Sequence, residues 1–324
     1  MILDVKDKKL LFEIDFNARR TYAELAKVLG MSKRGVEYKL QNLEKKNIIL
    51  GYSPIIDITS FGFNYYRVFI EFQNLTKELK KEIEKYIRQD NNIGWAIWTY
   101  GTYSIGFTIW AKTVTEFKEI INKFYFSFGK YIKERTESIA TEVQFYKNKF
   151  LLSKNSEDVL IIKEKKKQQN YDELDIKILK EIIREPRAKI ITISSKLGEP
   201  TKKISYRLKK LYVNKILLGV RPLLNHQLLG KTYYKLFINL NNTNKEQIKK
   251  LETYVANDKK VIYIVKALGT CDFDVELMVN SNEELFEFIN NIQEKFPGTI
   301  KDYKTTILTK TIKAKFLPEK VEFK

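Results

Sequence analysis

Apolar residues near the start of the chain recur at helical spacing in three short stretches. In residues 7–16 the apolar positions share one helical face, and in residues 21–30 a similar pattern ends at a glycine, a residue that often follows a helix. The third stretch begins after Ser32, a good N-cap residue, and places Val36 and Leu40 one turn apart. We therefore expect three consecutive helices.

The residues that follow are β-branched and aromatic, which is typical of strands. The segment NIILGYSPIIDI after the third helix is β-like and completes the order helix, helix, turn, helix, short strand pair of a winged helix-turn-helix. Strand-like and helical runs then follow in the order β-α-β-β-α-β, at residues 65–72, 76–90, 93–101, 103–111, 113–128 and 139–146. This is the ferredoxin-like order, an antiparallel sheet with helices on one face, so the other face needs a cover.

The chain contains this whole arrangement twice. A shift of 168 residues aligns the sequence with itself without a gap from about Asp7 to Thr141. The fold class is therefore predicted as α+β, with two winged helix-turn-helix domains alternating with two ferredoxin-like (βαββαβ) domains. The expected divisions are winged helix-turn-helix domains at 1–60 and 171–228, ferredoxin-like effector and dimerisation domains at 61–150 and 229–324, and a Lys-rich linker at 151–170.

Length and charge narrow the choice of partner. A chain of 324 residues with 44% hydrophobic content is long enough for several domains, since single cores rarely grow beyond roughly 250 residues. The chain has 59 Lys and Arg against 40 Asp and Glu, a formal net charge of +19. This balance favours a polyanion such as nucleic acid, or an anionic membrane surface. A proteome that is generally rich in Lys is the alternative explanation.

Membrane proteins, disulfide-bonded proteins and metalloenzymes are disfavoured, because the sequence has no long apolar run and few Cys and His residues. No run approaches the roughly 20 apolar residues that span a bilayer, so we expect a cytoplasmic protein without a membrane partner. Cys271 is the single cysteine and His226 the single histidine. They cannot form an internal disulfide, a thiolate zinc cluster or a site built from several His side chains. We therefore expect no catalytic residue, no metal and no cofactor.

Several motifs recur in both copies in the same order. An Asp opens the first helix (Asp7, Asp175) and an Arg precedes the second (Arg19, Arg187). The third-helix pattern VEYKLQNLE or ISYRLKKLY leads into NIILGY or KILLGV, and the second domain carries the turn GTYS or GTCDFD. With these motifs the chain resembles the Lrp/AsnC family of leucine-responsive and asparagine regulators over nearly all of both copies.

The resemblance implies both a function and an assembly. In that family the second domains pair through their sheets, the dimer displays two DNA-reading heads, and an amino acid often binds between domains. A chain with two copies is then expected to pair them internally as a covalent pseudo-dimer, with further homo-oligomerisation left open. The implied function is a DNA-binding transcriptional regulator, with double-stranded DNA as partner and a small amino-acid-like molecule as effector.

DNA reading is expected on the third helix of each copy, because an α-helix fits the major groove. Lys39 and Arg207 occupy the family's basic position within this helix. The alternative is a solvated helix that Lys and Arg simply coat. The residues expected at the DNA are Ser32, Lys33, Arg34, Glu37, Tyr38, Lys39 and Gln41 in copy one, and Thr201, Lys202, Lys203, Ser205, Tyr206, Arg207, Lys209 and Lys210 in copy two.

The turns at residues 101–104 and 269–272 resemble the family's effector motif, in which glycine permits close approach and an acid orients an amine. The expected effector residues are Gly101, Thr102, Gly269, Thr270 and Asp272, and only copy two has the acid. A plain β-hairpin turn is an equal alternative. The three tryptophans alternate along strands and are expected in the sheet core or an interface.

Two alternative functions remain open. Siroheme decarboxylases resemble the same two-domain pattern, and basic residues here could hold propionates, although a single His offers little for that chemistry. A scaffold whose heads no longer bind DNA is the other alternative.

The two heads differ in charge. Residues 1–57 hold 11 basic and 8 acidic side chains, net +3, whereas residues 172–225 hold 13 and 6, net +7. The second head is expected to grip phosphate and the first to discriminate between sequences.

Overall fold

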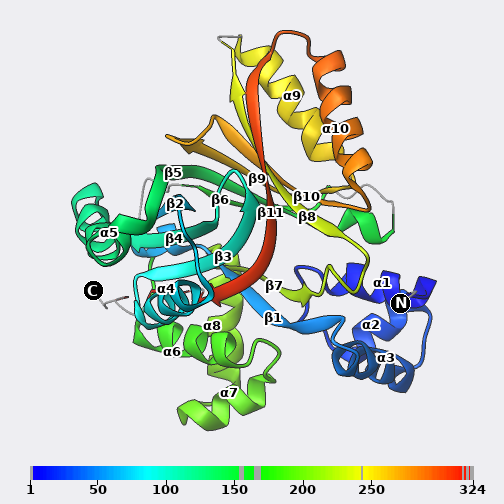
Figure 1. The fold of residues 1–324 in the computed structure, drawn as a ribbon. Helices are drawn as coiled ribbons and strands as arrows, with labels where there is room; N and C mark the ends of the chain where they lie inside the picture. Colours follow the sequence, from blue (N-terminus) through cyan, green and yellow to red (C-terminus); the bar gives the residue numbers. More distant parts are fainter. Residues whose placement is uncertain are drawn as a thin grey trace.

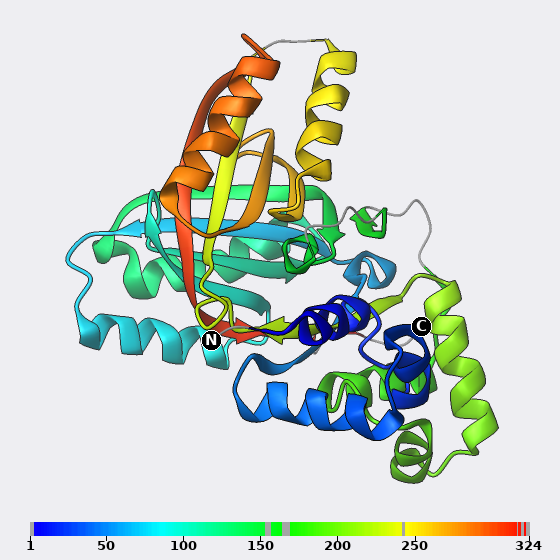
Figure 2. The same cartoon turned by 90° about the vertical axis from the view of Figure 1, so that its right-hand side faces the viewer.

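The computed structural model of the chain describes residues 3–152, 157–163, 169–241, 244–315, 317, 318 and 321. Two helical heads lie on one side of a β-barrel (Figure 1). A view from the side shows the same arrangement, with the last two helices of the chain at the end away from the heads (Figure 2). The helices of the heads are α1 (Val5–Ile14), α2 (Tyr22–Leu29) and α3 (Lys33–Lys45), then α6 (Glu173–Arg184), α7 (Ile190–Leu197) and α8 (Thr201–Val213).

Local sequence explains where the helices of the first head begin and end. The Thr21 and Glu24 side chains form a reciprocal capping box at the start of α2, and Gly30 follows its last residue. Ser32 accepts a hydrogen bond from the Gly35 N–H at 3.0 Å, as predicted for the cap of α3. Apolar residues of both heads, including Val36 in copy one and its counterpart Ile204, belong to one shared core. The three-helix prediction is confirmed.

The wing differs from the prediction of a strand pair within each head. Each copy supplies one strand, β1 (Ile49–Ile56) or β7 (Leu217–Leu224), and these two pair with each other in antiparallel fashion. Ser53 lies opposite Arg221 in this ladder, and the two are equivalent positions of the two copies, 168 residues apart. A pseudo-two-fold axis therefore passes between them. The apolar pattern of a strand is the same whichever neighbour it pairs with, so the sequence did not reveal this exchange.

The second domain of each copy has the predicted β-α-β-β-α-β order. In copy one the elements are β2 (Asn64–Phe72), α4 (Lys77–Gln89), β3 (Ile93–Gly101), β4 (Ile105–Ala111), α5 (Val114–Phe128) and β5 (Ile132–Tyr146). In copy two they are β8 (Thr232–Leu240), α9 (Lys245–Asn257), β9 (Val261–Leu268), β10 (Phe273–Val279), α10 (Asn282–Lys295) and β11 (Ile300–Ala314). Each sheet packs one face on its own two helices through a separate core.

The two sheets join into a closed barrel. The strand order is β2-β4-β3-β11-β8-β10-β9-β5-β6, and β2 also pairs with β5, which closes the circle of the first eight strands. The long strands β5 and β11 make the joins, because each pairs with its own sheet and then with β9 or β3 of the other copy. The face of each sheet that its helices leave open is thus covered by the other copy.

The segment predicted as linker contains a strand. Residues 149–151 form a short 3-10 turn, and β6 (Val159–Lys163) extends the sheet by pairing with β5. Short 3-10 turns also occur at Ile58–Phe61 and Gly129–Tyr131. Most of the Lys-rich end of the predicted linker, residues 164–168, lies outside the described residues.

The glycines of the two equivalent turns fit against the other copy. Gly101 and Gly269 have φ values of +118° and +112°. A Cβ on Gly101 would lie 2.9 Å from the Thr305 carbonyl oxygen, and one on Gly269 would lie 2.5 Å from that of Glu137. Thr305 and Glu137 are themselves equivalent positions on β11 and β5. Close contact between the copies therefore explains the glycine in each turn.

We predict that Gly269→Ala lowers the free energy of unfolding by about 3 kcal/mol, at the upper limit of local backbone strain. Gly230→Ala is a matched control, because Gly230 also has a positive φ, +66°, but no atom lies within 4 Å of the position that a Cβ would take there. The control should lose only about 1 kcal/mol. Urea unfolding followed by tryptophan fluorescence measures both. Equal losses would show that contact with the other copy does not require the glycine.

Candidate nucleic-acid interface

The residues predicted for DNA reading lie mostly on the open faces of α3 and α8. Eleven of the fifteen are exposed: Ser32, Lys33, Arg34, Tyr38, Gln41, Thr201, Lys202, Lys203, Ser205, Tyr206 and Lys209. The other four, Glu37, Lys39, Arg207 and Lys210, are half-buried. Both helices therefore present a polar, mainly basic face to solvent, as a helix that enters a groove must.

A large aromatic side chain projects from each of these faces. Tyr38 is 70% exposed and Tyr206 is 66% exposed, and they are equivalent positions of the two copies. An exposed tyrosine on a basic helix presents both an apolar ring and a hydroxyl to a partner. Neither ring serves the core of its head, so the pair favours an intermolecular contact.

Lys39 and Arg207 differ from their neighbours because they form ion pairs within the heads. Lys39 Nζ lies 2.7 Å from Asp4 and 2.8 Å from Asp7 at the start of α1. Burial alone would lower the pKa of Lys39, but its hydrogen bonds to these carboxylates outweigh burial and raise it. These charges tie α3 to α1 in the structure.

Arg207 repeats this contact in the second head. Its guanidinium lies 2.6 Å from Asp172 and 3.4 Å from Asp175, the equivalents of the two carboxylates in copy one. Asp175 is buried, and burial raises the pKa of its carboxyl. Sequence spacing could place the Arg on the helix, but the contact spans 32 residues and became visible only in the fold.

Two predicted contact residues also have local partners at the start of α8. Thr201 donates a hydrogen bond to Ser194 at 3.2 Å, and Lys203 pairs with Glu199 one turn away at 2.8 Å. The second pair is exposed, and such pairs contribute little to stability, so the Lys203 ammonium can exchange Glu199 for another anion. Lys202 extends from the same turn and is exposed.

The two heads are joined by a reciprocal pair of arginines. Arg19 donates hydrogen bonds to the carbonyl groups of Pro186 and Ala188 at 2.7 and 2.8 Å. Its equivalent, Arg187, donates to the Ala18 carbonyl at 2.9 Å. Both arginines belong to the repeated motif, for which the sequence predicted no contact. In the structure each crosses to the other head, which fixes α3 relative to α8.

The predicted effector turns face the partner copy. Thr102 donates a hydrogen bond to the Thr305 carbonyl at 3.0 Å, and the Thr270 hydroxyl is buried with no hydrogen-bond partner among the described residues. Asp272 is exposed, and its carboxylate accepts from the Leu240 N–H at 2.7 Å. Gly101 and Gly269 are exposed and pack on the long strands described above. One carboxylate oxygen of Asp272 therefore has a structural function already.

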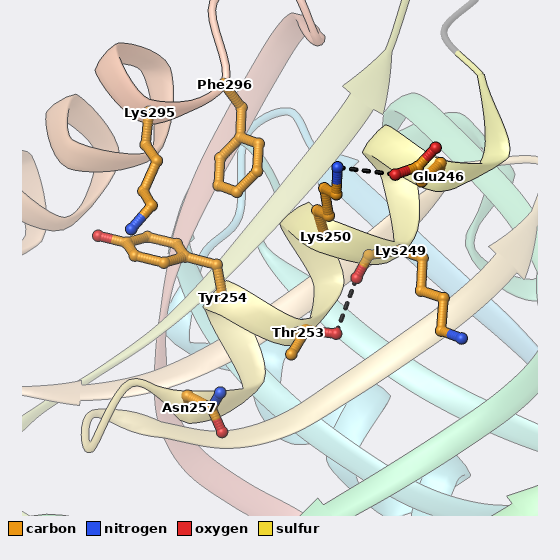
Figure 3. Close-up of a pocket in the computed structure, with 8 residues that line it drawn as sticks. All are labelled: Glu246, Lys249, Lys250, Thr253, Tyr254, Asn257, Lys295 and Phe296. Atoms are coloured by element: carbon orange, nitrogen blue, oxygen red, sulfur yellow. Dashed lines mark hydrogen bonds and ion pairs between the residues drawn. The ribbon is translucent and has the colours of Figure 1, made fainter.

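An open cleft lies elsewhere, between α9 and α10 (Figure 3). Lys295 lies over the Tyr254 ring, with its ammonium 4.6 Å from the ring centroid. None of the predicted effector residues lines this cleft. Its lining residues are Glu246, Lys249, Lys250, Thr253, Tyr254, Asn257, Lys295 and Phe296.

The remaining candidates for chemistry have contacts within the fold. Trp98 is buried in the core of the first sheet, Trp110 is buried in the core that includes both heads, and Trp95 is half-buried, where a sheet core or an interface was predicted for all three. Cys271 is buried, and burial raises the pKa of its thiol to about 12. His226 packs edge-on against Tyr233, and burial lowers its pKa. Among the described residues, no group of three or more His, Cys, Asp or Glu side chains could hold a metal, and no helix is long and apolar enough to cross a membrane.

Known proteins similar to this chain share its heads or its whole fold. A family model described as winged helix-turn-helix DNA-binding matches residues 3–49. The HTH-type transcriptional regulator LrpA of Pyrococcus abyssi is 28% identical over 121 residues, which cover 37% of this chain and 84% of the relative. Regulatory protein AsnC of Haemophilus influenzae is 28% identical over 119 residues, 37% of this chain and 79% of the relative.

A similarity in fold extends over both copies. The crystal structure of the siroheme decarboxylase NirDL superimposes with a TM-score of 0.62 and covers 97% of this chain and 94% of its own. The sequence identity is 12%, so this match bears on the fold alone. It supports the predicted fold class, in which winged helix-turn-helix and ferredoxin-like domains alternate in tandem.

The contacts on α8 predict different consequences for two neighbouring cations. Arg207→Met should lower the free energy of unfolding by about 2 kcal/mol, because it leaves Asp175 buried without its charged partner. It should leave the salt dependence of DNA binding nearly unchanged. The exposed Lys209→Met should cost under about 0.5 kcal/mol but lower the salt slope by about 0.9. Urea unfolding and DNA binding at several salt concentrations measure the two quantities, and the opposite assignment would contradict the positioning role of Arg207.

Proposed function

We propose that this protein, a transcriptional regulator of the Lrp/AsnC type, binds one DNA duplex as a covalent pseudo-dimer with two unequal heads. The resemblance to that family, predicted from the motifs of both copies, is confirmed by the curated relatives and by the winged helix-turn-helix match. The pairing within one chain, the division of labour between heads and the effector are the parts of the proposal that experiments must test.

One observation carries the proposal. Two equivalent helices, α3 and α8, present exposed basic faces with an exposed tyrosine each, and the heads that carry them are fixed to each other. The reciprocal contacts of Arg19 and Arg187 and the β1–β7 ladder supply that connection. A pair of recognition helices at constant separation is what a protein needs to contact two half-sites on one duplex.

The two heads differ in how they would contact DNA. On α3 the basic residues Lys33 and Arg34 share the helix with Glu37, whereas residues 200–211 around α8 contain no acid. Phosphate contacts supply affinity but little sequence information, and a carboxylate repels phosphate while it can accept from a cytosine amine. The second head is therefore the stronger phosphate binder, and the first is the more selective.

Fusion gives this asymmetry a consequence for the DNA site. A homodimer with two-fold symmetry favours palindromic sites, because both heads read the same sequence. Here the two recognition helices carry different side chains and are held in one chain, so the preferred site is not palindromic. Each head has a tyrosine at the equivalent position, Tyr38 or Tyr206. Any base sequence that the two half-sites have in common would therefore be recognised by these rings.

The proposed effector is a small amine-bearing metabolite beside Gly269 and Asp272. The free carboxylate oxygen of Asp272 could accept from an amine, and the turn lies where the two copies meet. Calorimetry with the amino acids should give heat for at least one of them, and that heat should disappear in Asp272→Asn. Absence of heat with every amino acid would leave this turn with a structural function only.

One alternative function is that of a siroheme decarboxylase, the activity named for NirDL, whose fold this chain shares. Another structure of that enzyme is a co-complex with an iron-uroporphyrin III analogue. In this chain the single histidine, His226, is packed against Tyr233, which leaves little imidazole chemistry. An absorbance scan of the protein mixed with iron-uroporphyrin separates the two functions, because a bound tetrapyrrole shifts its absorption bands whereas a DNA regulator leaves them unchanged.

DNA affinity should fall steeply as salt rises, because Lys and Arg contacts release condensed counterions. Neutralising Lys202 together with Lys203 should weaken binding to every sequence and reduce the salt slope by roughly 2, since each lost contact removes about 0.9. Fluorescence anisotropy with labelled duplexes at several salt concentrations measures the slope. A salt-independent affinity of the parent protein would exclude the DNA-binding proposal, and would favour a scaffold whose heads no longer bind DNA.

Replacing Lys33 together with Glu37 should change which sequences are preferred while non-specific affinity stays close to that of the parent. One positive and one negative charge are removed together, so the net charge of the first head is unchanged. Selection from a random duplex pool, followed by sequencing, measures the preference. The proposed division of labour is wrong if this variant and the Lys202/Lys203 variant lose equal affinity and keep the parent's preference.

A further inference from the structure

The interior of the barrel holds buried charges that the two copies supply unequally. Copy one contributes Arg67 on β2, which pairs with Asp274 on β10. Lys235 of copy two lies 2.5 Å from Asp274 and 2.8 Å from Glu276. All four side chains are buried, and Asp274 has no exposed surface. Two cations from different copies thus share two carboxylates from one copy.

These groups keep their charges inside the barrel. Burial alone would raise the pKa of Asp274, but Arg67 and Lys235 outweigh burial and hold it below its ordinary value. Burial would likewise lower the pKa of each cation, but the charge of Asp274 raises both. Removing one partner would leave an uncompensated buried charge, which is strongly destabilising.

A second buried ion pair joins the copies near the wings. Asp15 of copy one accepts from Arg221 of copy two, with N–O distances of 3.1 and 3.2 Å. Asp15 also accepts from the Asn148 N–H at 2.7 Å, and Arg221 donates to the Tyr263 hydroxyl at 2.8 Å. This pair therefore depends, like the first, on one group from each copy.

The barrel cluster would be unbalanced if two like copies paired in the same way. The positions equivalent to Asp274 and Glu276 hold Gly106 and Thr108 in copy one. Two copy-one halves would bury two Arg67 guanidinium groups with no carboxylate beside them. Two copy-two halves would bury four carboxylates against two lysines. Either arrangement leaves buried charge without a partner.

The ion pair near the wings excludes like pairs independently. Arg221 lies on the pseudo-two-fold axis opposite Ser53, so two copy-two halves would place Arg221 opposite itself. Like charges directly opposite in a ladder are destabilising. The equivalent of Asp15 is Ile183, which supplies no carboxylate. Two copy-one halves would instead bury two Asp15 carboxylates against serines.

We infer that each half of this chain accepts only the opposite half as its barrel partner, and that buried charge excludes a like half. A second chain could then join a barrel only by an exchange of opposite halves. The inference concerns the barrel interface and goes beyond the proposed DNA function, so a measurement of folding tests it whether or not DNA binds.

The test uses the full-length chain with two substitutions that give copy one the acids of copy two. The charged variant carries Gly106→Asp and Thr108→Glu, and its matched control carries Gly106→Asn and Thr108→Gln. A Cβ at position 106 would lie 3.0 Å from the Phe69 ring in both, so the steric cost is shared. Each variant is made with native copy two, and again with Asp274→Gly and Glu276→Thr in copy two.

The order of the urea midpoints should reverse between the two backgrounds. With native copy two, the charged variant should unfold at lower urea than its control, because four carboxylates meet two cations. With copy two substituted, the charged variant should unfold at higher urea than its control, because it alone supplies carboxylates for Arg67 and Lys235. The inference is overturned if the order of charged variant and control is the same in both backgrounds.

If the variants with four substitutions do not fold, a single substitution tests whether buried charge excludes a like half. Ser53→Arg places a second guanidinium opposite Arg221, and Ser53→Met adds a side chain of similar length without charge. The Arg variant should have the lower urea midpoint. A midpoint equal to or higher than that of Ser53→Met would overturn the exclusion of like halves.

Discussion

The antiparallel pairing of β5 with β9 and of β11 with β3 is the interaction on which the rest of this structure depends. The face of each sheet opposite its helices carries apolar side chains such as Phe69 and Phe237, and burying them between the copies is favourable. Each long strand leaves its own sheet and continues into the sheet of the other copy. Both open faces are covered in this way, and no strand among the first eight of the barrel keeps a free edge.

The closed barrel determines how the two heads lie relative to each other. Because the barrel fixes one copy relative to the other, β1 and β7 emerge close enough to pair, and the heads pack into one core. The side chains of Arg19 and Arg187 then each donate hydrogen bonds to backbone carbonyl groups of the other head. Helices α3 and α8 are therefore mounted on a single framework with pseudo-two-fold symmetry, to which β6 adds a strand that has no equivalent in copy two among the described residues.

Local patterns in the sequence were sufficient to predict most of the elements and their order, apart from the strand pair within each head and the strand β6. The helices of the heads follow from periodicity and caps such as Ser32, and the duplication follows from a constant offset of 168 residues. The candidate DNA residues were also found in this way, because a repeated amphipathic helix shows its polar face in the sequence. Most of these side chains are exposed in the structure, and their contact with DNA stays a prediction.

Contacts between distant residues could not be predicted in the same way. A charged residue at an alternating strand position usually faces water, so Arg67 and Lys235 gave no sign that they face the inside of a barrel. Lys39 and Arg207 were predicted to contact DNA because their carboxylate partners, Asp7 and Asp175, lie 32 residues away in the sequence. The exchange of wing strands depends on the pairing of whole copies, which strand composition does not encode.

The distance of 168 residues between the copies also orders events during synthesis. At roughly 5–20 residues per second, copy two follows copy one out of the ribosome by roughly ten to thirty seconds. During that interval Arg67 lacks Asp274, its carboxylate partner, and the strands of copy two do not yet cover the inner face of the first sheet. The first half must therefore wait in an incomplete state, and a nascent chain on a neighbouring ribosome presents it with the same half, which its buried charges reject.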